Sequence, residues 1–428
     1  MKHGSHIDRR LLVCCVVACC SLVAANCRPP HEASPEDGAE GTVEPADSTP
    51  GPGDPPTPGS DVMKRSAPAV VWNTYHGAAT LDGVADIRLP DKLELRWRFK
   101  AGAPVRTTPV GEAGRVFFTN AKGQVFRVDG DGIEVWSRTL TRAADDGQPL
   151  EEVLDAPPAY FDTTVMVGSA DGIVYALEAA TGADRWTADL DGTILGSAGY
   201  YATQDREHAS VMVIEQGSGM LHCLDFRTGQ HRWRADGVDR CDGPPSVGNG
   251  VVVFGSCAAA LHVFSADDGR LLRQIEIDPD SQVASGVALA GDSVFSGSRS
   301  GKVLCANTES GAIRWTNEDS DDEVFTTPAV NSEWVVVGSA DGNVYALDRA
   351  GGERRWAFTT QGSPSSPVIA GDKVLVSSGG TLFLLRLADG GMTWSHEVSD
   401  AITSPAVVGD LVIVGSDDGT VSAFGPMR

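Results

Sequence analysis

The stretch GSADGIVYALE at residues 168–178 recurs almost letter for letter as GSADGNVYALD at residues 338–348. In each copy a tryptophan, Trp186 or Trp356, lies eighteen residues after the first glycine. Self-similarity at a fixed spacing is typical of repeat architectures, in which each unit is a small supersecondary structure stacked on the next. The repeat therefore decides the fold before any single motif is considered.

The tryptophan of this repeat can be followed through the chain at intervals of 38 to 50 residues. Seven of the eight positions are tryptophan, and arginine occupies the other: Trp97, Trp136, Trp186, Trp233, Arg273, Trp315, Trp356 and Trp394. Most units combine a Thr-Pro or Ser-Pro opening, a valine-rich run, a Tyr-Ala-Leu run and the tryptophan run. Four short antiparallel strands in about forty residues are typical of a propeller blade.

The two ends of the repeat region complete each other. Residues 395–428 supply three strands of an eighth unit and then stop, whereas residues 93–99 form a tryptophan strand with no unit before it. Pairing these pieces closes a ring and hides the strand edges that an open array would expose. The sequence therefore predicts an all-β, eight-bladed propeller of four-stranded antiparallel blades over residues 93–428.

Residues 1–26 have the pattern of an export signal, because a basic start precedes an apolar run that is too short to span a bilayer. The small residues before Cys27 resemble a bacterial lipoprotein signal, in which the cysteine is lipidated. Cys19 and Cys20 are alternative lipidation sites, and an ordinary secretory signal is the other interpretation. The pattern predicts a bacterial envelope protein anchored to the outer membrane and facing the periplasm, or a periplasmic or secreted one without the lipid.

The segment that follows the signal is dense in proline, glycine and acidic residues. Residues 27–66 contain almost no large apolar side chain and cannot bury enough surface to offset the entropy of ordering, so they predict a disordered tether. Residues 67–92 then lead into the propeller.

The charge of the chain limits its partners. It has 34 Lys and Arg residues against 58 Asp and Glu residues, a formal net charge of −24. Such a field repels phosphate backbones and anionic lipid head groups, which excludes nucleic acid and leaves the lipid anchor as the expected membrane contact. We expect a monomer whose partners are proteins of the cell envelope.

The repeat Gly-Ser-x-Asp-Gly-x-x-Tyr-Ala-Leu-Asp, with a Thr-Gly turn and then tryptophan, resembles the repeat of PQQ-like (quinoprotein) propellers. The opening Trp72-x-x-x-His76-Gly77 is similar to that of many bacterial members. The resemblance spans residues 93–428. It implies a family that includes quinone-dependent dehydrogenases and also non-enzymatic propellers, among them the lipoprotein of the outer-membrane β-barrel assembly complex.

Most of the conspicuous residues have a structural interpretation. The blade tryptophans are expected to dock on the neighbouring blade, and Arg273 to leave one weak junction. The Asp-Gly pairs are expected to form tight turns, and His222 and His262 to be strand residues with satisfied hydrogen bonds. Cys241 and Cys257 fall at one edge of the fourth blade, and an oxidising compartment would join them in a disulfide.

The loops that differ between units are the candidates for partner contact. Residues 141–156 and 317–323 are expected on one face of the ring and residues 200–210 on the other. The acidic residues proposed for contact are Asp145, Asp146, Glu151, Glu152, Asp319, Asp321, Asp322 and Glu323. The acidic run 318–323 lacks the regular spacing of a calcium loop, which favours a solvated loop.

These observations favour a non-catalytic, envelope-anchored propeller that acts as a protein-interaction scaffold in outer-membrane protein assembly. One alternative is a PQQ-dependent dehydrogenase. The residues do not support it, because no set of side chains for a Ca²⁺–quinone site stands out and the adjacent cysteine pairs lie in the signal. The other alternative is a propeller that binds a carbohydrate or another cell-wall ligand.

Overall fold

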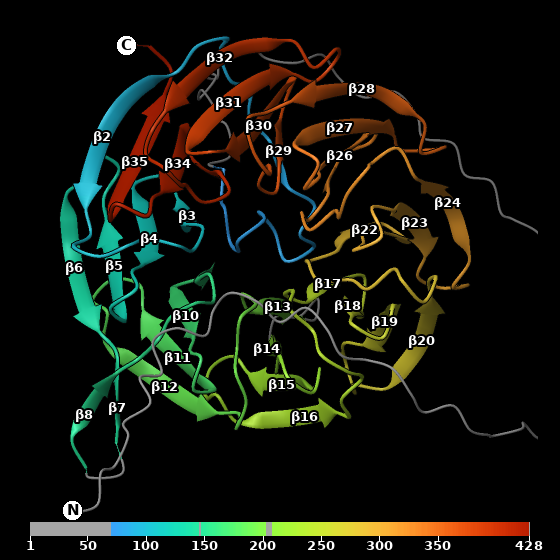
Figure 1. The fold of residues 1–428 in the computed structure, drawn as a ribbon. Coiled ribbons are helices and arrows are strands. Elements are labelled where there is room, and N and C mark those ends of the chain that lie inside the picture. Colours follow the sequence, from blue (N-terminus) through green and yellow to red (C-terminus); the bar gives the residue numbers. More distant parts are fainter. Residues whose placement is uncertain (1–69, 145–146, 203–207, 428) are drawn as a thin grey trace, which may run out of the picture. The chain divides into compact units, whose positions relative to one another are not determined.

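The computed structural model describes residues 70–144, 147–202 and 208–427. In this part of the chain eight sheets, each with the four antiparallel strands of one blade, stand around a common axis (Figure 1), which confirms the predicted eight-bladed propeller. The predicted signal and tether, with Cys19, Cys20 and Cys27, lie outside the described residues, as do Asp145 and Asp146. The described residues include no helix that could cross a membrane.

Blades one to four follow one another along the chain. Blade one is β3 (Val110–Glu112), β4 (Arg115–Thr119), β5 (Gln124–Val128) and β6 (Glu134–Thr139). Blade two is β9 (Ala159–Phe161), β10 (Thr164–Gly168), β11 (Ile173–Glu178) and β12 (Asp184–Asp189). Blade three is β13 (Gly199–Ala202), β14 (Ala209–Ile214), β15 (Leu221–Asp225) and β16 (His231–Ala235). Blade four is β17 (Ser246–Gly248), β18 (Val251–Ser256), β19 (Ala260–Ser265) and β20 (Leu271–Glu276).

Blades five to seven continue the order. Blade five is β21 (Ala288–Ala290), β22 (Ser293–Gly297), β23 (Val303–Asn307) and β24 (Ile313–Asn317). Blade six is β25 (Ala329–Val330), β26 (Trp334–Gly338), β27 (Asn343–Asp348) and β28 (Arg354–Thr359). Blade seven is β29 (Val368–Ala370), β30 (Lys373–Ser378), β31 (Thr381–Arg386) and β32 (Met392–Glu397).

Blade eight is built from both ends of the repeat region. It combines β33 (Ala406–Val408), β34 (Leu411–Gly415) and β35 (Thr420–Gly425) with β2 (Glu94–Lys100). In the antiparallel β2–β35 pair Trp97 lies opposite Ala423, with a bulge next to the tryptophan. The predicted closure is confirmed, because the strand that contains Trp97 completes the last blade (Figure 1).

The burial of each strand explains its residue pattern. The two middle strands of a blade are covered on both faces by neighbouring blades, so β26 and β27 are nearly continuous apolar runs. In the outer strand β28 exposed and more buried residues alternate, and Trp356 is its one buried residue. The outer strand therefore contributes one large side chain, the tryptophan ring, to the contact between two blades.

Six of the seven blade tryptophans, all except Trp394, cap a glycine turn of the following blade. A Cβ atom added to Gly229 would fall 2.4 Å from the ring of Trp186, and one added to Gly352 would fall 2.5 Å from the ring of Trp315. The indole N–H donates to a main-chain carbonyl beside that turn, from Trp186 to Phe226 at 2.9 Å and from Trp315 to Arg349 at 2.9 Å. Equivalent indole-to-carbonyl bonds are made by Trp97, Trp136 and Trp356.

The junction between blades four and five differs, because Arg273 stands at the tryptophan position. Its Nε atom donates to the carbonyl oxygen of Glu309 at 2.9 Å, which reproduces the indole hydrogen bond. No aromatic ring covers the Gly311 turn of blade five. A Cβ atom added to Gly311 would have no other atom closer than 3.8 Å. A groove of about 530 Å³ remains between the two blades, with Leu271 at its edge 44% exposed.

The lead-in segment runs inside the ring against the inner strands, where β1 (Val84–Ala85) pairs in parallel with β29. Its carbonyl oxygens accept main-chain hydrogen bonds from seven blades, from Gly409, Gly111, Tyr160, Val247, Leu289, Val330 and Ile369. These belong to blades eight, one, two, four, five, six and seven. The described lead-in residues accept no such bond from blade three.

Replacing Arg273 by tryptophan should stabilise the propeller. The ring would fill the groove above Gly311 and add about 1 kcal/mol to the free energy of unfolding. Thermal denaturation followed by circular dichroism measures the effect. As a matched control, Trp186→Arg should destabilise the protein by about 3 kcal/mol, because it empties a filled junction. Equal destabilisation by both variants would contradict this account.

Candidate functional site

The two faces of the ring carry different structures. The face with the turns between the first and second strands of each blade is termed the turn face, and the face with the connections between blades is termed the connection face. The hairpin of β7 (Thr141–Ala143) and β8 (Pro149–Glu151) and the acidic loop 317–323 belong to the connection face. The end of β13 at Ala202 and the start of β14 at Ala209 lie at the turn face, and residues 203–207 between them lie outside the described part.

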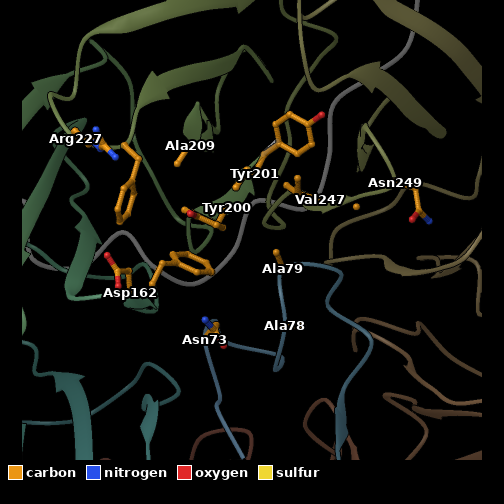
Figure 2. A pocket seen from close by; sticks show the side chains of 14 residues that line it. Asn73, Ala78, Ala79, Asp162, Tyr200, Tyr201, Ala209, Arg227, Val247 and Asn249 are labelled. Carbon is orange, nitrogen blue, oxygen red and sulfur yellow. The ribbon is translucent and has the colours of Figure 1, made fainter. Parts of the chain in front are cut away.

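One pocket opens on the turn face at blade three. Its volume is about 820 Å³, and blades two, three and four line it together with the lead-in segment (Figure 2). The lead-in forms a tight loop at this point, in which the Asn73 N–H donates to Gly77 and the Thr74 hydroxyl donates to Ala78 at 3.1 Å. Asn73, Ala78 and Ala79 of this loop line the pocket.

An aromatic cluster forms one wall of this pocket. The ring of Tyr200 stacks on Phe161 with the centroids 4.8 Å apart, and it meets Phe226 edge-on at 5.3 Å. Tyr201 is fixed by its hydroxyl, which donates to Asp267 at 2.9 Å. The neighbouring wall is small and apolar, with Ala79 among its residues.

Two charged side chains stand at one end of the pocket, and Asn249 stands at the other (Figure 2). Asp162 lies in the β9–β10 turn with a φ of 53°. Arg227 lies in the β15–β16 turn, where its main-chain N–H donates to Asp225. Among the described residues, neither the Asp162 carboxylate nor the Arg227 guanidinium has a side-chain partner. The sequence analysis singled out residues 200–210, which supply Tyr200, Tyr201 and Ala209 to this site, but it did not relate them to the lining residues from the other segments.

A second hollow, of about 320 Å³, lies at the centre of the ring toward the connection face. The Thr-Pro and Ser-Pro openings and their equivalents line it, and every blade contributes to it. Tyr75 of the lead-in closes it from within, with its hydroxyl hydrogen bonded to Thr327 and Ser366. Burial raises the pKa of Tyr75, which keeps the phenol neutral.

The residues of this central hollow do not fit a Ca²⁺–quinone cofactor. Its charged lining residues are Arg106, Asp155 and Asp242, and Asp242 is already bonded to Arg240 at 2.9 Å. In the part of the chain that the structure describes, no group of three or more His, Cys, Asp or Glu side chains could hold a metal ion. The other lining groups are mainly hydroxyl-bearing or small side chains.

The β7–β8 hairpin projects from the ring between blades one and two (Figure 1). An ion pair between Arg142 and Asp171, at 2.9 Å, ties the hairpin to blade two. Leu150 is 44% exposed and Val153 is 46% exposed, and Glu151 is also exposed. The hairpin therefore presents apolar and acidic groups together to the solvent.

Glu152 does not belong to this exposed surface, so its prediction as a contact residue is wrong. The Glu152 N–H donates to Leu140 at 3.0 Å, which folds the chain back onto the ring. Its carboxylate is 1% exposed and accepts a hydrogen bond from the Tyr175 hydroxyl at 2.6 Å. Burial, followed by the neighbouring Glu152, raises the pKa of Tyr175.

The acidic loop 317–323 is largely neutralised by the ring beneath it. Glu318 lies 3.0 Å from Lys302, Asp319 lies 3.8 Å from Arg354, and Glu323 lies 3.7 Å from Arg299. Asp321 and Asp322 are exposed. The carboxylates of Glu318, Asp319 and Glu323 point to separate cations rather than converge on one point, which agrees with a solvated loop.

His222 and His262 occupy the Tyr position of the third strand in blades three and four. His222 Nδ1 lies 3.0 Å from His231 Nε2, and His262 Nε2 lies 2.9 Å from the Ser256 hydroxyl. The other ring nitrogen of each is buried without a partner, so these histidines are only half satisfied. Burial lowers the pKa of each to about 4, and His231 acts in the same direction on His222.

The four described cysteines are free thiols in the structure, so the predicted Cys241–Cys257 disulfide is not formed in it. Cys241 is buried and Cys257 is half-buried. The Cys257 N–H donates to the carbonyl oxygen of Arg240 at 2.8 Å, which holds the two chain segments side by side. Burial, followed by the neighbouring Cys257, raises the pKa of Cys241.

Comparison with known proteins gives a family match over most of the chain. Residues 91–193, 170–276 and 258–426 match the family model described as outer membrane protein assembly factor BamB. The search of curated proteins found none that matches the sequence.

Three solved structures illustrate the likeness in fold. BamB from Moraxella catarrhalis is 20% identical, covers 79% of this chain and 98% of its own, and superposes with a TM-score of 0.65. The quinohemoprotein alcohol dehydrogenase from Comamonas testosteroni is 14% identical, with coverages of 84% and 81% and a TM-score of 0.65. The computationally designed Ika8 protein is 19% identical, with coverages of 78% and 100% and a TM-score of 0.67. At these identities the likeness shows the fold alone.

Acidification should destabilise the propeller through His222 and His262. Because the pKa of each is about 4 in the folded state and about 6.5 when unfolded, folding favours the neutral ring. This stability is fully present above pH 6.5 and is lost as the pH falls toward 4, by about 2 kcal/mol per histidine at pH 5. Urea unfolding at pH 7.5 and pH 5 measures the loss. His262→Phe, which copies Phe383 of blade seven, should reduce it, and an unchanged loss would refute the assignment.

Oxidation should join Cys241 to Cys257, as the sequence predicts. Treatment with a small-molecule disulfide would convert the two thiols into one disulfide through thiol–disulfide exchange, with the reagent reduced to its thiols. Mass spectrometry of a non-reduced digest would detect the linked peptides. Cys257→Ser should abolish the link, whereas Cys305→Ser should leave it intact. If the oxidised native protein does not form the linked peptides, the predicted Cys241–Cys257 disulfide is contradicted.

Proposed function

This chain belongs to the family described as outer membrane protein assembly factor BamB, and from that premise we propose that it is a non-catalytic protein-interaction scaffold of the bacterial cell envelope. Its work would be the assembly of outer-membrane proteins, which the family description names. Lipidation at Cys27 would anchor the chain, and residues 27–66 would let the propeller stand off the membrane.

The observation that carries this proposal is the β7–β8 hairpin. Propellers acquire individual functions where an insertion interrupts the repeat, and this hairpin is the insertion with its own pair of strands. Exposed Leu150 and Val153 lie beside exposed Glu151. An apolar centre with a polar rim is the composition of a protein-binding patch. The connection face is thus the proposed working face, and its partners are envelope proteins.

A PQQ-dependent dehydrogenase is the alternative that the fold itself suggests. The quinohemoprotein alcohol dehydrogenase shares the propeller. The central hollow of this chain argues against the same chemistry here, because Asp242 is committed to Arg240 and no metal-binding group of side chains is present among the described residues. A direct assay separates the two functions. Saturable PQQ binding in the presence of Ca²⁺, with dye-linked alcohol oxidation by the full-length protein, would refute the scaffold function.

The double variant Leu150→Glu and Val153→Glu should lose its envelope partner. Charges at the centre of an apolar contact must be desolvated without compensation, so we expect at least a tenfold drop in crosslinked partner recovered from cells. Ile313→Glu is the matched control, since Ile313 is 43% exposed on the outer strand of blade five. It should leave recovery unchanged. Equal recovery with the double variant would place the contact elsewhere.

A further inference from the structure

We propose that the pocket at blade three is a binding site for a short neutral oligosaccharide. This site has no part in the scaffold function proposed above, because it opens on the turn face and the β7–β8 hairpin belongs to the connection face. The inference rests on four properties of the described residues, namely a rigid wall, an aromatic wall, a pair of uncommitted charges and a matching size.

The inner wall of the pocket is preformed. The Asn73 side-chain amide donates to Tyr160 at 2.9 Å, and Thr74, which is 1% exposed, donates through its hydroxyl to Ala78. The following Gly77 has a φ of 92° and packs against the fully buried ring of Trp72. A loop fixed by this many contacts loses little entropy when a ligand binds, which favours a site for a weakly interacting molecule.

The outer wall offers aromatic and small apolar surface. Tyr200 and Tyr201 are both half-buried, so part of each ring reaches the pocket, and Phe161 supports Tyr200 from behind by stacking. Sugar rings have one face of C–H groups and a rim of hydroxyls. The C–H face suits an aromatic wall, and the small side chains of Ala79 and Ala209 leave room for it on either side of the pocket.

The charged end of the pocket selects the kind of ligand. The Asp162 carboxylate only accepts hydrogen bonds, and the Arg227 guanidinium only donates them. An anion would meet Asp162 and the net charge of −24, whereas a cation would meet Arg227. A hydroxyl both donates and accepts, so the hydroxyls of a neutral sugar could bond to the Asp162 carboxylate and to the Arg227 guanidinium alike. Asn249 can form similar bonds at the far end (Figure 2).

The size of the pocket agrees with this ligand class. A volume of about 820 Å³ lies within the range of small-molecule sites and exceeds what one sugar ring needs. We therefore assign it to an oligosaccharide rather than to a monosaccharide.

Calorimetric titration of the full-length protein with three trisaccharides tests the assignment. The probes are tri-N-acetylchitotriose, maltotriose and cellotriose, and we expect at least one to bind with a Kd tighter than about 1 mM. Asp162→Asn and Arg227→Gln keep the shape of the site and should each weaken that binding at least tenfold. Asp410→Asn, in the corresponding turn of blade eight, should have no effect.

Three results would overturn the proposal. One is the absence of saturable binding by all three trisaccharides. Another is binding that both pocket variants retain, because the sugar would then lie elsewhere. The third is binding of a tyrosine-containing tripeptide, but of no sugar, in a manner sensitive to Asp162→Asn, which would make this a peptide site. Each result is independent of the envelope partner recovered through the hairpin.

Discussion

The contact between an outer-strand indole and a glycine turn of the next blade holds this ring together. Each blade is a small sheet that cannot cover its own faces, so its stability depends on its two neighbours. The indole supplies the covering surface and a directional hydrogen bond, as in the pair of Trp186 with Gly229 and Phe226. Glycine is required at that turn because a side chain would occupy the place of the ring. Arg273 keeps the hydrogen bond to the next blade but lacks the aromatic ring that would cover the glycine turn. This junction therefore shows the hydrogen bond without the apolar contact.

The lead-in segment adds a second set of connections, at the inner side of the ring. Seven blades donate a main-chain N–H to it, so blades that are distant in sequence share one strand-like partner. His76 is fully buried there, with its ring nitrogens 2.9 Å from the Leu81 carbonyl oxygen and 2.8 Å from that of Pro367. The same segment lines the pocket at blade three with Asn73, Ala78 and Ala79. The lead-in segment therefore both links the blades and forms part of the pocket wall.

The sequence predicts this fold well because its main signal is periodic. Trp97 and the unfinished last unit revealed even the closure of the ring, since both lie in register with the other repeats. Properties that depend on contacts between distant segments were not accessible in this way. Glu152 reads as a solvated loop residue, yet the chain folds back and buries it under Tyr175. The blade-three pocket joins Asn73, Asp162, Arg227 and Asn249, and no spacing in the sequence relates them.

The pairing of β2 with β35 also explains where the repeat region begins and ends. Glu94 lies opposite Gly425, so the two ends meet where another blade would have a hairpin turn between its third and fourth strands. The lead-in segment reaches β2 across the turn face of blade seven, where Asp91 pairs with Lys373 of β30. Because no turn joins β35 to β2, blade eight offers no glycine turn to the outer strand of blade seven. Trp394 of that strand instead stacks on His396 and meets Phe424 edge-on.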